Sequence, residues 1–452
     1  MRLFRSLIVS AVLGASFGPP AFASDTPLAP SGSLPSELPP APSLREQADI
    51  RDAWLAERLD TLLPELMRKH GVEMWILVAR EYLEDPVMAT MFDATTMRAR
   101  RRTILVFHDR GEAAGVERLT VSRYGMGDFF EPGWTPEDGQ DQWTRLGEIV
   151  AERDPETIAL NISPASAFAD GLSKSQYDGL MAALPEGYRD RIVDAHPLAI
   201  GWLETRTASE VERYAAIVRT ARAIIGEALS DAVIKPGVTT ADDVRWWYRQ
   251  RVAGLGGLNV WFHPSVAVQR EGEDGFLTGD TVIRPGDLVW TDFGIDYLGL
   301  STDTQHLAYV LKPGETDAPD GLKAGLRDAN RVQDLLTESF EVGLSGNAVL
   351  AEARRKALAE GLEPSIYTHP IGHHGHGAGP SIGFWDNQDP DPRGSGPVNA
   401  GTAWAIELNA TRTVPEWGGQ RVEFRTEEDA FFDGETVRYL DGRQTELTLI
   451  GG

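Results

Sequence analysis

Two aspartates eleven residues apart, Asp292 and Asp303, stand in the segment DLVWTDFGIDYLGLSTDTQHLAYV. The apolar stretches 288–290 and 307–310 are typical of the two strands of a hairpin. A turn centred between Tyr297 and Leu298 would place the aspartates directly opposite one another on one face. Because two carboxylates that close repel each other, a bound cation is needed to neutralise them. Taken alone, the pair is equally compatible with side chains that point to solvent.

The run THPIGHHGHGAGPSIG at 368–383 is a second candidate for chemistry, since it holds four of the nine histidines of the chain. These are His369, His373, His374 and His376. Glycines let a backbone approach a bound ion or substrate closely, and the apolar residues at either end favour a packed segment over a solvated loop. We therefore expect this run to take part in metal binding or catalysis.

Two more carboxylates stand inside strand-like runs. Glu407 lies in the run WAIEL, and Glu427 lies in the run RTEEDAFF. A charge within a short apolar run is costly unless it is paired or bound to a cation. Each glutamate alone is weak evidence, because the solvated faces of strands commonly carry glutamate.

The composition sets the class of protein and excludes several functions. A length of 452 residues favours two domains, and 42% hydrophobic with 25% charged residues is ordinary for globular proteins. The net charge of −25 would repel a polyanion, so we expect no nucleic-acid partner. The absence of cysteine excludes disulfides, thiolate zinc sites, iron–sulfur clusters and a cysteine nucleophile.

The first residues predict an exported protein. Arg2 and Arg5 precede an apolar stretch, 7–18, which leads to the small-residue pattern AFA at 21–23. This order is typical of a signal peptide, which we assign to residues 1–23, with an uncleaved anchor as the alternative. No later stretch is long and apolar enough to predict a membrane span. We therefore expect a periplasmic or secreted protein with no membrane partner once the signal is removed.

The rest of the chain divides into a leader and two domains. Residues 24–43 are rich in proline and serine and predict a disordered leader. From Leu44 a helical pattern runs to about His70, and strand-like runs then alternate with helical ones. This alternation predicts an α/β N-terminal domain over 44–203, followed by a second domain over 204–452.

The second domain shows an internal repeat of a helix, a glycine and another helix. The two glycine breaks, Gly237 and Gly343, are 106 residues apart. Thr240 and Asn347 are the polar residues that open the second helix of each copy, and a strand-rich region follows each one. Two similar α+β halves predict a pseudo-two-fold with a site where they meet, whereas chance similarity is the alternative.

These elements, in this order, resemble the pita-bread metallopeptidases, a family that includes methionine aminopeptidase, prolidase and aminopeptidase P. The resemblance covers roughly residues 206–449 and includes IKPG at 234–237, IRPGD at 283–287 and DFG at 292–294. It implies an α+β chain with a C-terminal pita-bread catalytic domain. The domain before it would be an α/β domain like that of creatinase and prolidase.

In this family two aspartates eleven apart, one histidine and two glutamates hold two divalent metal ions. The resemblance assigns the five roles to Asp292, Asp303, His376, Glu407 and Glu427. Glu423 is the fallback for the last position. His376 stands in GHGAG, which reproduces the family pattern Gly-His-x-x-Gly. His373 keeps a second register open, because His369 and His373 match the His-x-x-x-His of the proline-specific branch.

The implied cluster is also physically reasonable. Four carboxylates and one neutral imidazole place about −4 around two dications, which gives a nearly neutral cluster that can be buried. Oxygen-dominated ligation suits manganese, cobalt or zinc without choosing among them.

The residues that orient substrate in relatives are altered here. The family histidine about twenty residues before the first aspartate is missing, and His263 is the nearest substitute. The second family histidine, seven residues after the ligand, falls on Gly383 if His376 is the ligand. The usual Thr-Arg-Thr after the second aspartate is Thr-Gln-His at 304–306. The candidates for orienting substrate are therefore His263, His369, His373 and His374.

The resemblance implies a metallo-exopeptidase that hydrolyses N-terminal peptide bonds in short peptides, with Xaa-Pro peptides as expected substrates. The two ions would lower the pKa of a shared water and present hydroxide to the peptide carbonyl. Glu407 or Glu427 would move a proton to the leaving amine, and His369 and His263 are the other catalytic candidates. The alternatives are a metal-dependent hydrolase of another small amide or ester, and a catalytically silent peptide-binding module. A homodimer is left open.

Overall fold

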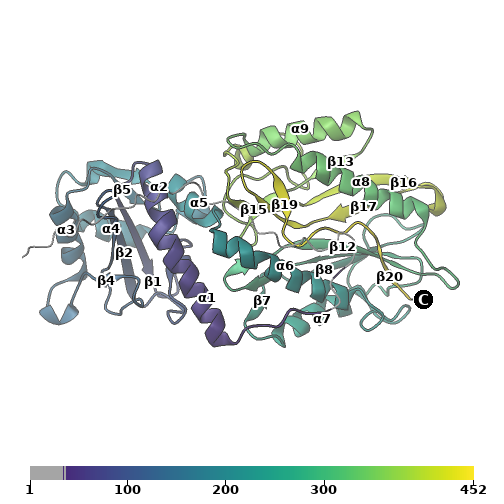
Figure 1. Ribbon diagram of the computed structural model, residues 1–452, viewed down its shortest axis with the longest axis horizontal. Coiled ribbons are helices and arrows are strands. Elements are labelled where there is room, and N and C mark those ends of the chain that lie inside the picture. The colour runs from purple at the N-terminus through teal and green to yellow at the C-terminus, as the bar shows by residue number, and fades with distance from the viewer. Residues whose placement is uncertain (1–33, 35–36, 452) are drawn as a thin grey trace, which may run out of the picture.

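The computed structural model describes residue 34 and residues 37–451, which form two domains joined by a long helical segment (Figure 1). The signal peptide expected at 1–23 lies outside the described residues. Within the described part of the chain, no helix combines the length and the apolar character needed to cross a bilayer.

The N-terminal domain is built on one six-stranded sheet with the order β4-β3-β2-β1-β5-β6. Its central strand β1 (Met74–Arg80) pairs antiparallel with β2 (Arg102–Asp109) and parallel with β5 (Ile158–Leu160). The other strands are β3 (Val116–Thr120), β4 (Glu131–Pro132) and β6 (Ile192–Asp194). The α/β architecture expected for this domain is confirmed.

Both faces of this sheet are covered, which is why β1 is apolar along nearly its whole length. Trp75, Leu77 and their neighbours pack with α2 (Leu63–Lys69) and α5 (His196–Glu204). Met74, Ile76 and their neighbours pack on the opposite face. That face is covered by α3 (Gln142–Arg153) and α4 (Lys174–Ala183).

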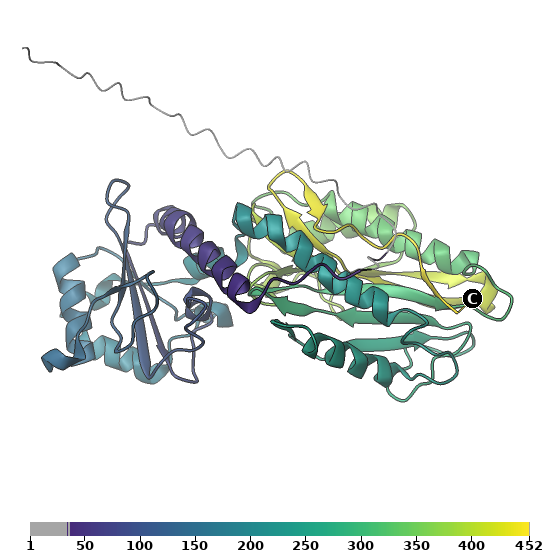
Figure 2. The ribbon, with the colours of Figure 1, turned by 60° about the horizontal axis from the view of Figure 1, so that its bottom comes forward.

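The helix predicted from Leu44 is continuous but changes its winding. It consists of α1 (Leu44–Glu57), a π-turn at Arg58–Leu62, and α2. Ser43 begins α1 with a capping box, in which Glu46 is the partner. In the turned view of Figure 2, α1 crosses between the two domains.

Part of the proline-rich leader packs on the rest of the protein where the structure describes it. Leu34 and Leu38 contact the core of the C-terminal domain. Gln47 at the start of α1 also donates a hydrogen bond to the carbonyl oxygen of Pro42 (3.0 Å). These apolar contacts supply the burial that a proline-rich composition does not reveal.

The C-terminal domain contains the two predicted helix–glycine–helix units. The first unit is α6 (Ala208–Ala228) with α7 (Ala241–Ala253), and the second is α8 (Asp320–Thr337) with α9 (Gly346–Ala359). The two break residues have positive φ, 81° at Gly237 and 88° at Gly343. Their amides donate in equivalent ways, Gly237 to the Ile283 oxygen (2.7 Å) and Gly343 to the Val398 oxygen (2.9 Å). The same backbone solution is therefore used in both halves.

One detail of the second unit differs from the expectation. The side chain of Ser345, and not that of Asn347, caps α9 by accepting from the amide of Ala348 (3.1 Å). Asn347 instead forms hydrogen bonds with the backbone of Asp391.

The strands of the domain lie between the two helix pairs (Figures 1 and 2). One sheet has the order β20-β12-β9-β8 and a second has the order β14-β15-β18-β19. Two smaller sheets have the orders β13-β16-β17 and β11-β10-β7. The strands not bounded elsewhere in the text are β7 (Leu258–Val260), β8 (Ser265–Gln269), β13 (Pro364–Ile366), β19 (Val437–Tyr439) and β20 (Thr448–Ile450).

The hairpin that carries the first two aspartates has a register different from the predicted one. β9 (Leu288–Phe293) pairs with β12 (Thr304–Val310) so that Asp292 faces Gln305 and not Asp303. Between them, β10 (Ile295–Tyr297) and β11 (Leu300–Ser301) enclose the turn residues Leu298 and Gly299. Both turn residues have positive φ, 57° and 84°, as a two-residue hairpin turn requires. Placing Gly299 in the turn moves its centre one residue later than expected.

Candidate metal centre

The strands of both halves bring one row of side chains to the same face. Asp292 faces Gln305 across β9 and β12, and Gln305 is bridged to Glu427 by backbone hydrogen bonds in both directions (3.0 and 3.2 Å). The ladder of β16 (Leu408–Val414) with β17 (Gln420–Thr426) continues into that of β15 (Thr402–Ala405) with β18 (Asp429–Phe432). Glu407 therefore faces Glu427, because directly opposed residues share a face.

A second row lies two residues further along the same strands. It contains Asp303, Asp429 and His369, and His369 lies in β14 (His369–Ile371) opposite Ala405. The amide of Asp303 donates to the carboxylate of Asp429 (3.1 Å), which ties the two halves together in this row. Since side chains of a strand repeat their direction every two residues, both rows point to the same place.

The ligand atoms of these rows form one contiguous group. Nε2 of His369 lies 3.4 Å from Oε1 of Glu427, 3.9 Å from Oδ2 of Asp303 and 4.0 Å from Oε2 of Glu407. Asp292, Asp303 and Glu427 also offer oxygens that all lie within 4.8 Å of one another. The structure thus brings all four predicted carboxylates together.

The electrostatics of this group are unfavourable for bare carboxylates. Burial raises the pKa of Asp292 to about 7 and that of Glu407 to about 8. The pKa values of Asp303 and Glu427 are raised well above the ordinary range, first by burial and then by their charged neighbours. Arg425 opposes the rise at Asp292 and Glu407, but one cation does not neutralise four acids.

The hydrogen bonding of the group fits divalent cations. Four polar atoms of the group are buried and lack a hydrogen-bond partner among the described residues. They are Oδ1 of Asp292, Oδ1 of Asp303, Oε1 of Glu427 and Nε2 of His369. Glu407 differs, because its Oε1 accepts from Nε2 of Gln305 (2.8 Å). Buried polar atoms without partners are costly unless something else satisfies them, and oxygen-rich donor sets with an imidazole suit divalent metals.

The geometry favours His369 over His376 as the imidazole of this centre. His369 is only 3% exposed, and its Nδ1 lies 3.0 Å from its neighbour's oxygen, that of Pro370. This contact leaves Nε2 free to face the carboxylates, and burial lowers the pKa of the ring to about 3, so it is neutral. His376 is exposed, although one of its nitrogens lies within 4.8 Å of ligand atoms of Asp303 and His369.

The sequence also contains a pattern that favours His369 as the ligand. His369 and Gly372 keep the spacing of His-x-x-Gly, and His376 lies seven residues after His369. That is the spacing of the second family histidine from the ligand. In this register His369 would be the ligand and His376 would lie beside the centre, the reverse of the roles that the sequence assigned.

The other candidate residues point elsewhere. His373 Nδ1 lies 3.2 Å from the oxygen of Gly299, and His374 stacks on Phe168 of the N-terminal domain (4.8 Å between ring centroids). The ring of His263 lies against Trp246 of α7 (5.3 Å). None of the three belongs to the ligand groups found among the described residues.

Glu423, the fallback ligand, is not part of the cluster either. Its carboxylate pairs with Arg425 (2.9 Å) at the side of a cleft that reaches Asp292 and Glu407. The sequence did not single out several residues that act here: Gln305, Tyr367, Arg425 and Asp429. Each of them stands two residues from a candidate ligand along the chain, and that spacing is the sequence signal that could have found them.

The cleft beside the acids has aromatic and polar walls. It is lined by Trp290, Tyr367, Trp385, Asn409, Thr411 and Arg425. Trp385 is 75% exposed, so its ring is available to a molecule bound in the cleft. The acids therefore lie at the inner end of an open cleft that can receive a small molecule or a chain end.

One family model matches the C-terminal domain. Residues 216–425 match the sequence model of metallopeptidase family M24. No curated protein sequence matches the chain.

Solved structures share the fold over nearly their whole length. The X-Pro aminopeptidase of Thermotoga maritima MSB8 has a TM-score of 0.61 at 18% identity, over 85% of this chain and 99% of the other. The Xaa-Pro dipeptidase of Bacillus anthracis gives 0.57 at 17%, over 90% and 100%. The prolidase of Pyrococcus horikoshii OT3 gives 0.53 at 14%, over 89% and 99%. The chain therefore shares the fold of these peptidase structures, and its C-terminal, pita-bread domain carries the match to metallopeptidase family M24 over residues 216–425.

Proposed function

We propose that this protein is a metallo-exopeptidase that hydrolyses the N-terminal peptide bond of short peptides, with proline after the scissile bond. The observation that carries the proposal is the convergence of four carboxylates, those of Asp303 and Glu427 buried, with the unprotonated nitrogen of His369. The preference for Xaa-Pro peptides draws support from the two-domain fold shared with structures described as Xaa-Pro peptidases.

The proposed cofactor is a pair of divalent ions, manganese, cobalt or zinc, held by Asp292, Asp303, Glu407, Glu427 and His369. Four carboxylates would balance the charge of two dications, which accounts for burying groups that otherwise repel each other. When bound, the ions would lower the pKa of a shared water and polarise the peptide carbonyl.

The residues of the chain itself supply orientation and proton transfer. Glu407 keeps 21% of its side chain exposed to the cleft, and Gln305 fixes one of its oxygens. Gln305 is held in turn by Nε1 of Trp290 (3.0 Å). This combination of exposure and fixed orientation makes Glu407 the residue that passes a proton to the leaving amine.

His376 and Tyr367 would contact the substrate. Their rings lie next to His369, at centroid distances of 4.8 and 5.3 Å. Partial desolvation lowers the pKa of His376, so its ring is neutral near pH 7 and can donate one hydrogen bond to a substrate carbonyl. Trp385 would cover the apolar ring of proline at the mouth of the cleft.

Export is part of the same proposal. The arginines, the apolar stretch and the AFA pattern of the first 23 residues favour a periplasmic or secreted location, where short peptides would be the substrate. A homodimer stays a prediction.

A panel of dipeptides and tripeptides tests the activity. Purified protein is loaded with manganese, cobalt or zinc, and each metal form is given pairs of peptides that differ only in proline or alanine at the second position. Release of the first residue, faster for proline and abolished by Asp292→Asn, is the expected result. Hydrolysis of other amides or esters only would favour the alternative hydrolase. Peptide binding without turnover in any metal form would favour the silent binding module.

A further inference from the structure

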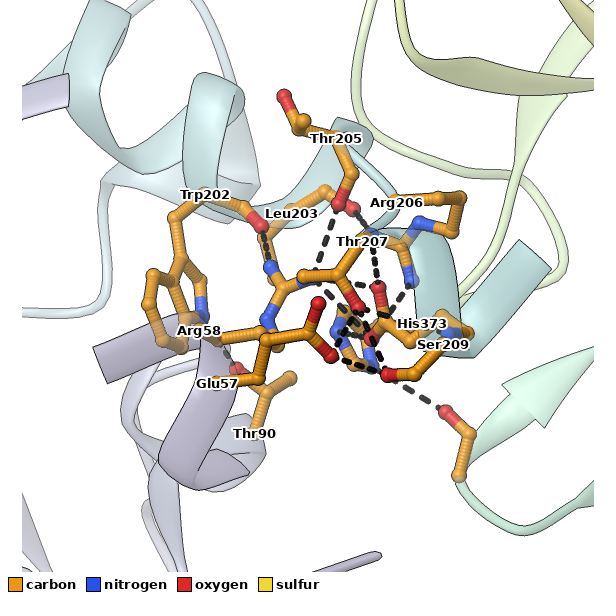
Figure 3. Close-up of polar contacts among 12 residues, drawn as sticks. Glu57, Arg58, Thr90, Trp202, Leu203, Thr205, Arg206, Thr207, Ser209 and His373 are labelled. Atoms are coloured by element: carbon orange, nitrogen blue, oxygen red, sulfur yellow. Dashed lines mark hydrogen bonds and ion pairs between the residues drawn. The ribbon is translucent and has the colours of Figure 1, made fainter. Parts of the chain in front are cut away.

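A buried polar cluster joins the two domains beside His373 of the histidine run (Figure 3). Its charged members include Arg58 of the π-turn, Arg206, and Glu210 of α6. Glu57 of α1 joins it by accepting from Thr207 (3.0 Å), and His373 of the run points into it. None of the groups in this cluster belongs to the metal centre. Its member His373 nevertheless lies four residues after His369 and three before His376 along the chain.

Arg58 brings the N-terminal domain into this cluster. Its Nη1 donates to both oxygens of Glu210 (3.1 and 2.9 Å) and to the carbonyl oxygen of Thr205 (2.8 Å). Its guanidinium lies over the ring of Trp202 at 4.4 Å. Arg58 begins the π-turn, a winding that is rare and often found at functional sites, because it survives only where tertiary contacts stabilise it.

Glu210 links this arginine to the histidine run. It is fully buried, and its Oε2 accepts from the amide of Thr207, which completes the capping box of α6 (2.8 Å). Oε1 lies 3.7 Å from Nη1 of Arg206 and 3.8 Å from Nε2 of His373. This carboxylate thus bonds Arg58 of the N-terminal domain directly and lies in contact with Arg206 and with His373 of the run.

The loop 372–374 is held from several sides. The amide of Ser301 donates to the oxygen of Gly372 (2.6 Å). Gly372 itself packs on the guanidinium of Arg206, where an added Cβ would lie 3.2 Å from Cζ. Phe168 of the N-terminal domain stacks on His374. The next residues are tied back to the strand of His369, because the amide of Gly377 donates to the oxygen of Pro370 (2.7 Å).

We infer that Arg58, Glu210 and Phe168 are positioning residues, through which the N-terminal domain fixes the loop 372–374 and, with it, His369 and His376. Removing one partner of a buried ion pair leaves an uncompensated charge, so the loop would relax away from its present position. His369 has its correct place relative to Glu427 only while the loop is held. This inference rests on the proposed metal site.

Two variants test the inference in the full-length chain. Arg58→Met removes the ion pair, and Phe168→Ala removes the stack on His374 from a half-buried position that is less important for folding. Arg270→Met is the control for the first variant, because Arg270 forms a two-bond pair with Asp287 (2.7 and 2.9 Å) within the catalytic domain. Tyr124→Ala is the control for the second, because Tyr124 is a half-buried N-terminal ring under Arg100.

The first readout needs no metal. Hydrogen–deuterium exchange in the metal-free proteins is expected to rise at the amides of Gly372 and Gly377 in both test variants, and to stay at the wild-type rate there in both controls. The second readout is the titration of Co²⁺ followed by its visible absorption. The dissociation constant is expected to rise by about 10- to 100-fold in the test variants only, as when an outer partner of a metal ligand is lost.

The two readouts separate failure of this inference from failure of the proposed function. If the wild-type protein binds no Co²⁺, the metal site is wrong, and loop exchange alone decides whether the N-terminal domain holds the loop. If the wild type binds Co²⁺ and Phe168→Ala matches it in both exchange and affinity, the inference is overturned, whatever the folding of Arg58→Met.

Discussion

The metal-free protein should lose stability as the pH rises, because its buried acids titrate far above their ordinary range. Asp292 shows the size of the effect, since burial raises its pKa from 3.8 to about 7. At about 1.4 kcal/mol for each pH unit, this difference corresponds to about 4 kcal/mol. The folded state holds the proton more tightly than the unfolded state does. The contribution is therefore fully present below the unfolded pKa and is lost as the pH rises through the folded pKa.

The assay is urea unfolding in the presence of a chelator, at several pH values between about 5 and 8. The free energy of unfolding of the wild type should fall across this range, and Glu407, with its pKa raised to about 8, adds to the fall in the same direction. Asp292→Asn carries no charge at this position. It should show a shallower fall and, near pH 8, a higher stability than the wild type, by up to about 4 kcal/mol.

Adding manganese, cobalt or zinc should reverse the pH dependence of the free energy of unfolding, because metal ligands must lose their protons before they bind. The metal-loaded wild type should gain stability with pH over the range in which the chelated protein loses it, and Asp292→Asn should gain less. A chelated wild type whose stability rises between about pH 5 and 8, or a variant less stable than the wild type near pH 8, would refute the reasoning.

Three further outcomes follow from the geometry of the centre. His369→Ala should weaken metal binding by more than about 10-fold, whereas His376→Ala should keep the metal and lower kcat, as metal titration and steady-state kinetics will show. Glu427→Gln should lower the amount of bound metal, while Glu423→Gln, its matched control four residues earlier in β17, should leave the metal content unchanged. Gln305→Leu should keep the metal but lower kcat more than it changes KM, because it frees one oxygen of Glu407. A variant with the kcat of the wild type would contradict this role.

The carboxylates could be predicted because their signal is local. Asp292, Asp303, Glu407 and Glu427 each stand inside or beside an apolar run that is typical of a strand, and a charge in such a place needs a partner. The glycine breaks at 237 and 343 also have local signatures, since a positive φ after a helix favours glycine.

The histidine roles needed the register of the sheets. The pattern around His376 keeps the glycine before the histidine, whereas the pattern around His369 keeps the second histidine seven residues later, so each matches the family in a different respect. The pairing of β14 with β15, in which His369 faces Ala405, decides between them, and no short-range signal reveals that pairing. The predicted turn of the hairpin lay one residue too early because Leu298 adopts a positive φ, which is rare for a leucine.

The contact between the domains could not be predicted at all. Arg58 and Glu210 are separated by 152 residues, and neither stands in a pattern that indicates an ion pair. The same holds for Leu34 and Leu38, whose proline-rich surroundings predict disorder while the surface of the C-terminal domain provides the apolar contacts.

The metal content of the protein tests the central claim most directly. After removal of loosely held ions and reloading with manganese, cobalt or zinc, elemental analysis of the wild type should give about two ions per chain. The double variant Asp292→Ala with Glu427→Ala should give close to none. A wild type that retains fewer than about one ion per chain, or a double variant that retains as many as the wild type, would contradict the assignment of these residues as a metal centre.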